Sequence, residues 1–171
     1  CTGVTVLGSV RFHCWKKEGH GSQDMINGLK NSCDCYFYEI ARRAGIHQIA
    51  ETARMFGLGS AEGLDLPGEK PGLIPDTSWK KAVIGDVWHP GETLVAGIGQ
   101  GFITTTPLQL CVMTARIANG GFAVKPRLVR RISDEAQNDE GNPVFPSVQI
   151  PLNFLRVVRA GMDAVTNGDH G

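Results

Sequence analysis

The fold depends on the segment Asn31-Ser32-Cys33-Asp34-Cys35-Tyr36-Phe37-Tyr38. Its first residues are small, polar and prone to form turns, whereas Tyr36 opens a predicted helix that ends at Ala44, before Gly45. A shorter helix is predicted just upstream, over residues 23–31, with Ser22 as its cap. Ser32 and Asp34 therefore fall at a break between two helices, where side chains can project into a cleft.

This Ser-x-Asp triplet has two interpretations. In the structural one, Ser32 or Asp34 caps the following helix by accepting hydrogen bonds from the amides of its first turn. In the functional one, both side chains belong to a catalytic cleft. The triplet alone favours the cap, so the surrounding sequence has to decide.

The sequence predicts few strands and several helices around this break. Val4–Leu7, Gly8-Ser9 and Val10–Phe12 are typical of a short hairpin. Downstream of Gly45 a helix is predicted that buries one face, formed by Ile46, Ile49, Ala50, Ala53 and Phe56. Residues 57–90 hold many Gly and Pro residues and are predicted to be a long ordered loop.

The second half of the chain begins with a predicted strand, Glu92–Ile98. Thr106 and Pro107 then start the most clearly delimited helix, which runs to Ala118. A strand interrupted at Pro126 is expected over Phe122–Ile132, and an exposed polar segment over 133–147. Pro151 opens a last helix ending near Asn167, with one apolar stripe: Leu152, Leu155, Val158, Met162 and Val165.

Composition limits the functional classes. The 171 residues carry 17 Lys+Arg and 17 Asp+Glu, so the chain lacks the positive field that gathers nucleic acid or anionic membranes. Its longest apolar runs, such as Leu94–Ile98, are far shorter than the roughly 20 residues that a membrane-spanning helix needs. Because the chain starts at Cys1 rather than Met, we expect it to be a piece of a longer protein.

Two motif-like runs are better explained by structure. Gly97, Gly99 and Gly101 lack the Lys-Ser/Thr of a phosphate loop, so we assign them to a close backbone approach beside a strand end. Ser78 and Lys81 formally satisfy Ser-x-x-Lys, but they lie in the Gly/Pro-rich region, where Lys80 and Lys81 are expected to form a solvated basic face.

The wider context of Ser-x-Asp resembles a known family. The runs that carry the resemblance are Trp15-Lys16-Lys17, Gly19-His20-Gly21, Asn31–Tyr38, Trp88-His89-Pro90-Gly91-Glu92-Thr93, Ile98–Gly101 and Thr106–Gln109. In this order and spacing they are similar to the transpeptidase domain of the class B, elongation-type penicillin-binding protein 2 family, from Cys1 to Gly171. The resemblance implies an α+β fold of the β-lactamase/transpeptidase type, of which this chain is a helix-rich segment.

The resemblance also implies a catalytic role for the triplet. Family members carry Ser-x-x-Lys with the nucleophile, then Ser-x-Asn or Ser-x-Asp, then Lys-Ser/Thr-Gly. Ser32 and Asp34 correspond to the second motif, Ser32 as a proton relay and Asp34 as a hydrogen-bond partner of the lysine or the substrate amide. The other two motifs are expected upstream of Cys1 and downstream of Asn167, so residues 1–171 alone are expected to be a partial, inactive transpeptidase domain.

The intact parent is expected, by the same resemblance, to cross-link peptidoglycan stem peptides through an acyl-serine and to bind β-lactams. It would work at the periplasmic face of the bacterial inner membrane with elongation-machinery proteins, anchored by an N-terminal segment outside this chain. The main alternative is a noncatalytic, zinc-stabilised structural or interaction module. A helix-turn-helix that binds DNA is disfavoured by the neutral charge.

A second site is predicted from the cysteines, four of which precede residue 36. Cys1, Cys14, His20 and Cys33 match a closed tetrahedral zinc site in ligand type and number, and some relatives carry zinc near the second motif. Cys35 could replace Cys33, and His13 could replace His20. Two other possibilities stay open: a Cys1–Cys14 disulfide in an oxidising periplasm, or neither a metal nor a disulfide. Cys111, between apolar neighbours, is expected to be a small buried residue.

Overall fold

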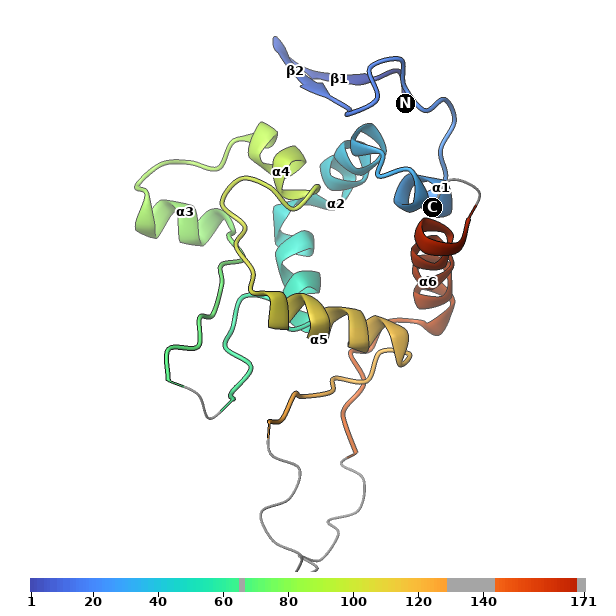
Figure 1. The fold of residues 1–171 in the computed structure, drawn as a ribbon. Helices are drawn as coiled ribbons and strands as arrows, with labels where there is room; N and C mark the ends of the chain where they lie inside the picture. Colours follow the sequence, from blue (N-terminus) through green and yellow to red (C-terminus); the bar gives the residue numbers. More distant parts are fainter. Residues whose placement is uncertain (65–66, 129–143, 169–171) are drawn as a thin grey trace, which may run out of the picture.

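The computed structural model describes residues 1–64, 67–128 and 144–168. Its elements are a small hairpin and helices, shown in Figure 1: β1 Val4–Leu7, β2 Val10–His13, α1 Met25–Lys30, α2 Asp34–Met55, α3 Thr77–Val83, α4 Pro90–Ala96, α5 Pro107–Ala118 and α6 Leu152–Asn167. The predicted helix-rich character is therefore confirmed. Within the described residues, no helix is both long and apolar enough to cross a bilayer.

The hairpin forms as predicted. β1 and β2 are antiparallel, with Leu7 opposite Val10 and Val4 opposite His13. Gly8 has a φ of 61°, the left-handed value that the first central residue of a two-residue hairpin turn needs. The hairpin is joined to α2 by Phe12, whose ring packs edge-on against Tyr38 at 5.7 Å.

Two predicted helices around Gly45 form one element with a kink. Gly45 has φ 78° and ψ 159°, so α2 consists of a helix before it and a helix after it. The predicted apolar face is buried at Ile46, Ala50 and Phe56. Upstream, α1 starts later than predicted because Asp24, not Ser22, is its cap: the Asp24 carboxylate accepts from the Asn27 amide at 2.8 Å.

The prediction of a strand at Glu92–Ile98 is wrong, because these residues contribute to α4. Pro90 fits the first turn of a helix, and the Glu92 side chain accepts from the His89 amide at 2.7 Å. Thr93, Val95 and Ile98 are β-branched and favoured a strand, but the capping at His89 outweighs that preference. The close approach assigned to the three glycines is confirmed at Gly97, where an added Cβ would lie 2.3 Å from that of Ala41 as α4 crosses α2, but not at Gly99, which faces open space. The element before them is α4 and not the expected strand.

The predicted loop 57–90 also contains a helix, α3, capped by Asp76 through the Trp79 amide at 2.9 Å. The rest of the loop is held by α5, which starts as predicted. Thr106 caps α5, and Gln109, almost fully buried, donates from Nε2 to the carbonyls of Ser60 at 2.7 Å and Pro71 at 2.8 Å. One side chain thus fixes the loop against the helix.

The last helix, α6, packs the C-terminal part of the chain against earlier elements. α6 packs against α1 and α5, and Leu155 joins Phe56 and Val148 in a buried cluster. The predicted helix α6 is confirmed, but its apolar stripe is only partly buried, because Leu152 and Val165 are exposed. The predicted strand Phe122–Ile132 is wrong for its described part, which forms only an isolated bridge between Phe122 and Ser147. Residues 129–143, which hold the rest of that strand and most of the predicted polar segment, lie outside the described residues.

Candidate active-site motif and metal centre

The Ser-x-Asp triplet lies in the tight connection from α1 to α2, at the molecular surface. Ser32 is exposed and Asp34 is half-buried. Ser32 has a φ of 46°, a left-handed conformation that is uncommon for a residue with a side chain. The connection is short because the Ser32 and Cys33 amides donate to the carbonyls of Leu29 and Gly28, at 3.0 and 2.9 Å.

Neither residue caps the helix. The N-cap of α2 is Cys33, and it makes no side-chain capping bond. Asp34 is turned away from the helix amides, and its Oδ2 accepts from the backbone N–H of Trp15 at 2.9 Å. Within the described residues, Asp34 Oδ1 and the Ser32 hydroxyl make no hydrogen bond. The capping interpretation is therefore wrong. Among the described residues, both groups remain free to form a hydrogen bond with another molecule or segment.

Trp15 is the residue near the motif whose contribution the sequence did not reveal. Its indole Nε1 lies 3.0 Å from the carbonyl oxygen of Asn31 and 3.0 Å from that of Ser32. Its ring meets the His20 imidazole in a T-shaped contact with centroids 5.1 Å apart. These two side chains also line a surface hollow of about 480 Å³ beside the triplet. In the sequence, Trp15 stood out only as part of the run Trp15-Lys16-Lys17 and as the neighbour of Cys14, and neither showed this role.

The structure brings together the four side chains predicted as metal ligands. The ligand atoms of Cys1, Cys14, His20 and Cys33 all lie within 4.8 Å of one another. His20 Nδ1 is 3.6 Å from the Cys1 sulfur and 3.5 Å from the Cys14 sulfur. Tetrahedral zinc with ordinary Zn–S and Zn–N bonds places its sulfur and nitrogen ligands about 3.6 Å apart. The distances therefore fit such a site.

The electrostatics of the cluster suit a cation. Burial, aided by the positive charges of Lys16 and the N-terminal amine, lowers the pKa of His20, so its imidazole is neutral at pH 7 and offers a lone pair. Burial also raises the pKa of the Cys33 thiol, whose residue is fully buried. A divalent cation would reverse that second effect by stabilising the thiolate. His20 Nε2 is buried and has no hydrogen-bond partner among the described residues.

The sequence left open other ligands for this cluster and a disulfide in its place. Cys35 is buried beside Cys14 and Cys33 but is not among the converging ligands, and neither is His13. All five cysteines are free thiols, so the Cys1–Cys14 disulfide does not form in this structure. Cys111 is exposed, contrary to expectation, because its side of α5 has no covering element among the described residues.

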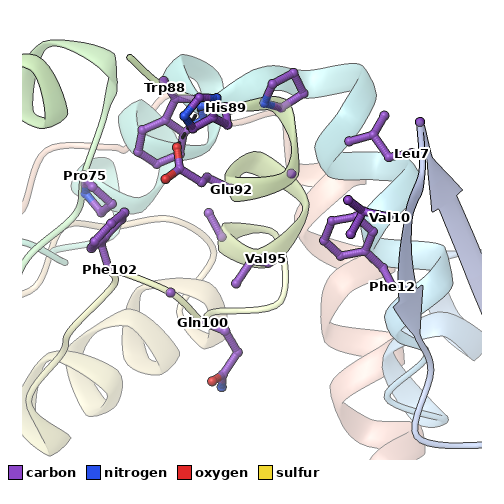
Figure 2. Close-up of a pocket in the computed structure, with 15 residues that line it drawn as sticks. Leu7, Val10, Phe12, Pro75, Trp88, His89, Glu92, Val95, Gln100 and Phe102 are labelled. Atoms are coloured by element: carbon purple, nitrogen blue, oxygen red, sulfur yellow. Dashed lines mark hydrogen bonds between the residues drawn. The ribbon is translucent and has the colours of Figure 1, made fainter. Parts of the chain in front are cut away.

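A second hollow, of about 510 Å³, separates the hairpin from α4. Figure 2 shows Leu7, Val10 and Phe12 of the hairpin on one side and Trp88, His89 and Glu92 on the other. Ser32 and Asp34 do not line it. The hollow is mostly apolar and contains no arrangement of acid, base and nucleophile.

The Ser-x-x-Lys-like run, Ser78 to Lys81, does not form a nucleophilic serine–lysine pair among the described residues. It lies on α3, where Ser78 and Lys81 are exposed. Lys80 is buried, contrary to the expected solvated face, and its Nζ bonds Glu92 Oε1 at 2.6 Å. Lys80, the neighbour of the motif lysine, is therefore committed to an ion pair, whereas Lys81 lies at the exposed surface.

Comparison with known proteins assigns the family. A family model described as the penicillin binding protein transpeptidase domain matches residues 1–171. The chain belongs to this family. Among its relatives, the peptidoglycan D,D-transpeptidase MrdA of Acinetobacter baumannii is 45% identical over 122 residues, covering 71% of this chain and 18% of the relative. MrdA of Escherichia coli K12 is 32% identical over 163 residues, covering 94% and 26%.

Solved structures of penicillin-binding proteins agree. Pseudomonas aeruginosa PBP2, in complex with WCK 5153, has a TM-score of 0.88 and 34% identity, with 99% of this chain and 37% of that chain covered. PBP2 of Helicobacter pylori, in complex with MreC, has a TM-score of 0.86 and 32% identity, with 99% and 30% covered. The expected β-lactamase/transpeptidase-like fold is therefore confirmed. This penicillin-binding protein chain spans about a quarter or less of the curated relatives above.

Proposed function

We propose that this chain supplies the second catalytic motif of a peptidoglycan D,D-transpeptidase. The observation that carries the proposal is the triplet itself: the exposed Ser32 hydroxyl and Asp34 Oδ1 are both without partners among the described residues, and the peptide between them is anchored. A reactive group held on rigid backbone but left open to solvent is suited to meet a substrate. MrdA relatives named as peptidoglycan D,D-transpeptidases support the reaction class.

Ser32 would act as a proton relay in acylation. A hydroxyl can donate and accept at once, so Ser32 can take a proton from a lysine while giving its own to the leaving amine. Asp34 Oδ1 would accept from that lysine's ammonium or from the substrate amide, because Oδ2 is already occupied by Trp15. The nucleophilic serine and its lysine would come from a Ser-x-x-Lys motif outside residues 1–171, and Lys-Ser/Thr-Gly would follow this chain.

The substrate would be a stem peptide of peptidoglycan, and a β-lactam would compete by acylating the same serine. We place the intact protein at the periplasmic face of the inner membrane, with partners from the elongation machinery. The solved complex of Helicobacter pylori PBP2 with MreC supports this choice of partners. The neutral net charge gives no support to nucleic acid as a partner.

Cys1, Cys14, His20 and Cys33 would hold a structural zinc ion in this protein. The fit of ligand types and spacings supports this assignment, as does the neutral state of His20. The ion would neutralise the thiolates and fix the backbone around them. Cys33 would then tie the peptide between Ser32 and Asp34 to the loop that carries Cys14, a positioning role for residues that take no part in the chemistry.

The experiment that tests the catalytic proposal replaces Ser32 in the complete gene product. Ser32→Ala should lower the second-order rate constant for acylation by a fluorescent penicillin at least tenfold, within the range of a general acid–base contribution. Ser78→Ala is the matched control, because Ser78 is also exposed and belongs to the other Ser-x-x-Lys-like run. It should leave the rate unchanged.

If Ser32→Ala labels as fast as the parent while melting at the same temperature, Ser32 has no relay role. The alternative, a zinc-stabilised structural or interaction module, would then be preferred. The convergence of four metal-type ligands, Cys1, Cys14, His20 and Cys33, is the observation that favours it.

A further inference from the structure

Trp15 is unusually placed for a tryptophan. It is 65% exposed, so burial of its ring cannot explain its position. It nevertheless contributes both its indole and its backbone N–H to hydrogen bonds with residues 16 to 19 positions away. These long-range hydrogen bonds fix the segment that contains Trp15 relative to residues 31–34.

The bonds of Trp15 reach both halves of the triplet. The indole N–H is shared between the carbonyls of Asn31 and Ser32, 3.0 Å from each. Ser32 has a disfavoured left-handed φ of 46°, and the bond to its carbonyl fixes the plane of the peptide that follows. The Trp15 amide bonds the Asp34 carboxylate at 2.9 Å. The Ser32 backbone and the Asp34 carboxylate are thereby held by the same residue.

Trp15 also contacts the Cys/His cluster. Its ring packs on His20, whose Nε2 lacks a hydrogen-bond partner among the described residues, so packing rather than a hydrogen bond restrains the imidazole there. Cys14 precedes Trp15, and Cys33 lies between Ser32 and Asp34. The segment that carries Cys14 and Trp15 therefore meets the Ser-x-Asp triplet at two adjacent points, one at the Cys/His cluster and one at Trp15.

We infer that Trp15 is a positioning residue for the transpeptidase reaction, whose indole N–H sets the orientation of Ser32 and whose amide sets that of Asp34. The inference rests on the proposed function of the triplet. In this role Trp15 acts through the Ser32 carbonyl and the Asp34 carboxylate, not through the sulfur ligands of the cluster.

The test is Trp15→Phe in the complete gene product, because phenylalanine keeps an aromatic ring for His20 but has no indole N–H to donate. Loss of this bond should lower the second-order rate constant of penicillin acylation by about three- to tenfold, the rate equivalent of one hydrogen bond. The fraction of protein labelled at saturation and the zinc content per chain should stay at the parent's values. A purely structural role would instead reduce the labelled fraction and leave the rate constant unchanged.

Trp88→Phe is the matched control. The Trp88 indole donates to the Thr93 hydroxyl at 2.8 Å, so the same substitution removes one indole hydrogen bond from another part of the chain. It should leave the acylation rate constant within about twofold of the parent. A Trp15→Phe rate equal to that of Trp88→Phe, or a loss of rate that accompanies loss of zinc, would overturn the inference.

A double variant shows whether Trp15 acts through Ser32. In the Ser32→Ala background, Trp15→Phe should cost less than twofold in rate, because the hydroxyl that it orients is gone. Losses that simply multiply would place the effect of Trp15 elsewhere and contradict the inference. Normal labelling of Ser32→Ala alone would instead refute the proposed function, so the two failures can be told apart.

Discussion

Cys33 belongs both to the Cys/His cluster and to the Ser-x-Asp triplet. It is fully buried, its sulfur converges with those of Cys1 and Cys14, and its backbone separates Ser32 from Asp34. Any change in the cluster that moves Cys33 also moves the motif. A fully buried residue thus fixes the backbone from which the Ser32 and Asp34 side chains project.

Replacing Cys33 by serine should remove the metal. We expect the complete gene product, purified without chelators, to contain about one zinc per chain, and the Cys33→Ser variant to contain less than about a third of that, since the site would lose one of its four ligands. Metal content is measured by inductively coupled plasma mass spectrometry.

Cys35→Ser is the control for that measurement. Cys35 is also buried and packs in the same cluster, but it does not converge with the ligand atoms. It should retain zinc. A parent protein without zinc, or one whose Cys1 and Cys14 are joined as a disulfide by peptide mapping, would disprove the metal assignment.

The helices α3 and α4 are joined by a buried charge. Lys80 of α3 is only 3% exposed and bonds Glu92 of α4, with Asp86 at 3.4 Å. Burial alone would lower the pKa of Lys80, but the hydrogen bonds to Glu92 and Asp86 raise it overall, so the lysine is charged. Glu92 also holds the His89 amide. The start of α4 and the body of α3 therefore depend on one carboxylate.

Asp76 stabilises α3 through its ionised form. It caps the helix at Trp79, and it pairs with Arg54 of α2 at 2.9 Å. The amide of Trp79 and then the Arg54 guanidinium lower the pKa of Asp76 below its usual value of 3.8. A lowered carboxyl pKa stabilises the folded state at pH above 3.8, and this contribution is lost as pH falls through the folded pKa.

Asp76→Ala should therefore lower the free energy of unfolding at pH 7 by about 1–2 kcal/mol, the usual effect of losing an N-cap. Asp76→Asn, which can still cap, should cost less. Urea unfolding followed by circular dichroism measures both variants. The difference between the parent and Asp76→Asn should shrink between pH 5 and pH 3; a constant difference over that range would contradict the role assigned to the charge.

On the scale of the whole molecule, apolar side chains are exposed in and outside the hollow between the hairpin and α4. The hollow between the hairpin and α4 is lined by Val10, Phe12 and Phe102, and Val10 is 54% exposed. Val83 and Ile84, at the end of α3, are exposed as well. Exposed apolar surface of this kind favours association.

The isolated chain should therefore self-associate. Light scattering at concentrations of about 10–100 μM should give a mass above the 18.4 kDa of the monomer. Val10→Lys should shift the mass toward the monomer by placing a charge at the hollow. Val144→Lys is the control, because Val144 is 98% exposed and does not line the hollow. A compact monomer at every concentration would show that this surface is not adhesive.

Several parts of the fold could be predicted because their causes are local. The hairpin follows from Gly8, the kink of α2 from Gly45, and the start of α5 from Thr106 and Pro107. In each case the decisive hydrogen bond or backbone angle involves residues within one turn of each other. The pattern of residues around Ser32 was also sufficient for the family, which the comparisons confirm.

The tertiary structure decided what depends on residues far apart in the chain. Whether Lys80 is buried depends on α4, twelve residues away, and whether Cys111 is covered depends on what packs on α5. The sequence supplied the types of the four cluster ligands, but their convergence needs the hairpin, its following loop and the start of α2 to pack together. The bond from Trp15 to Asp34 spans 19 residues. Sequence alone determined the family and some local elements, such as the hairpin and the start of α5, whereas only packing determined which side chains meet, because residue spacing does not fix distances between segments.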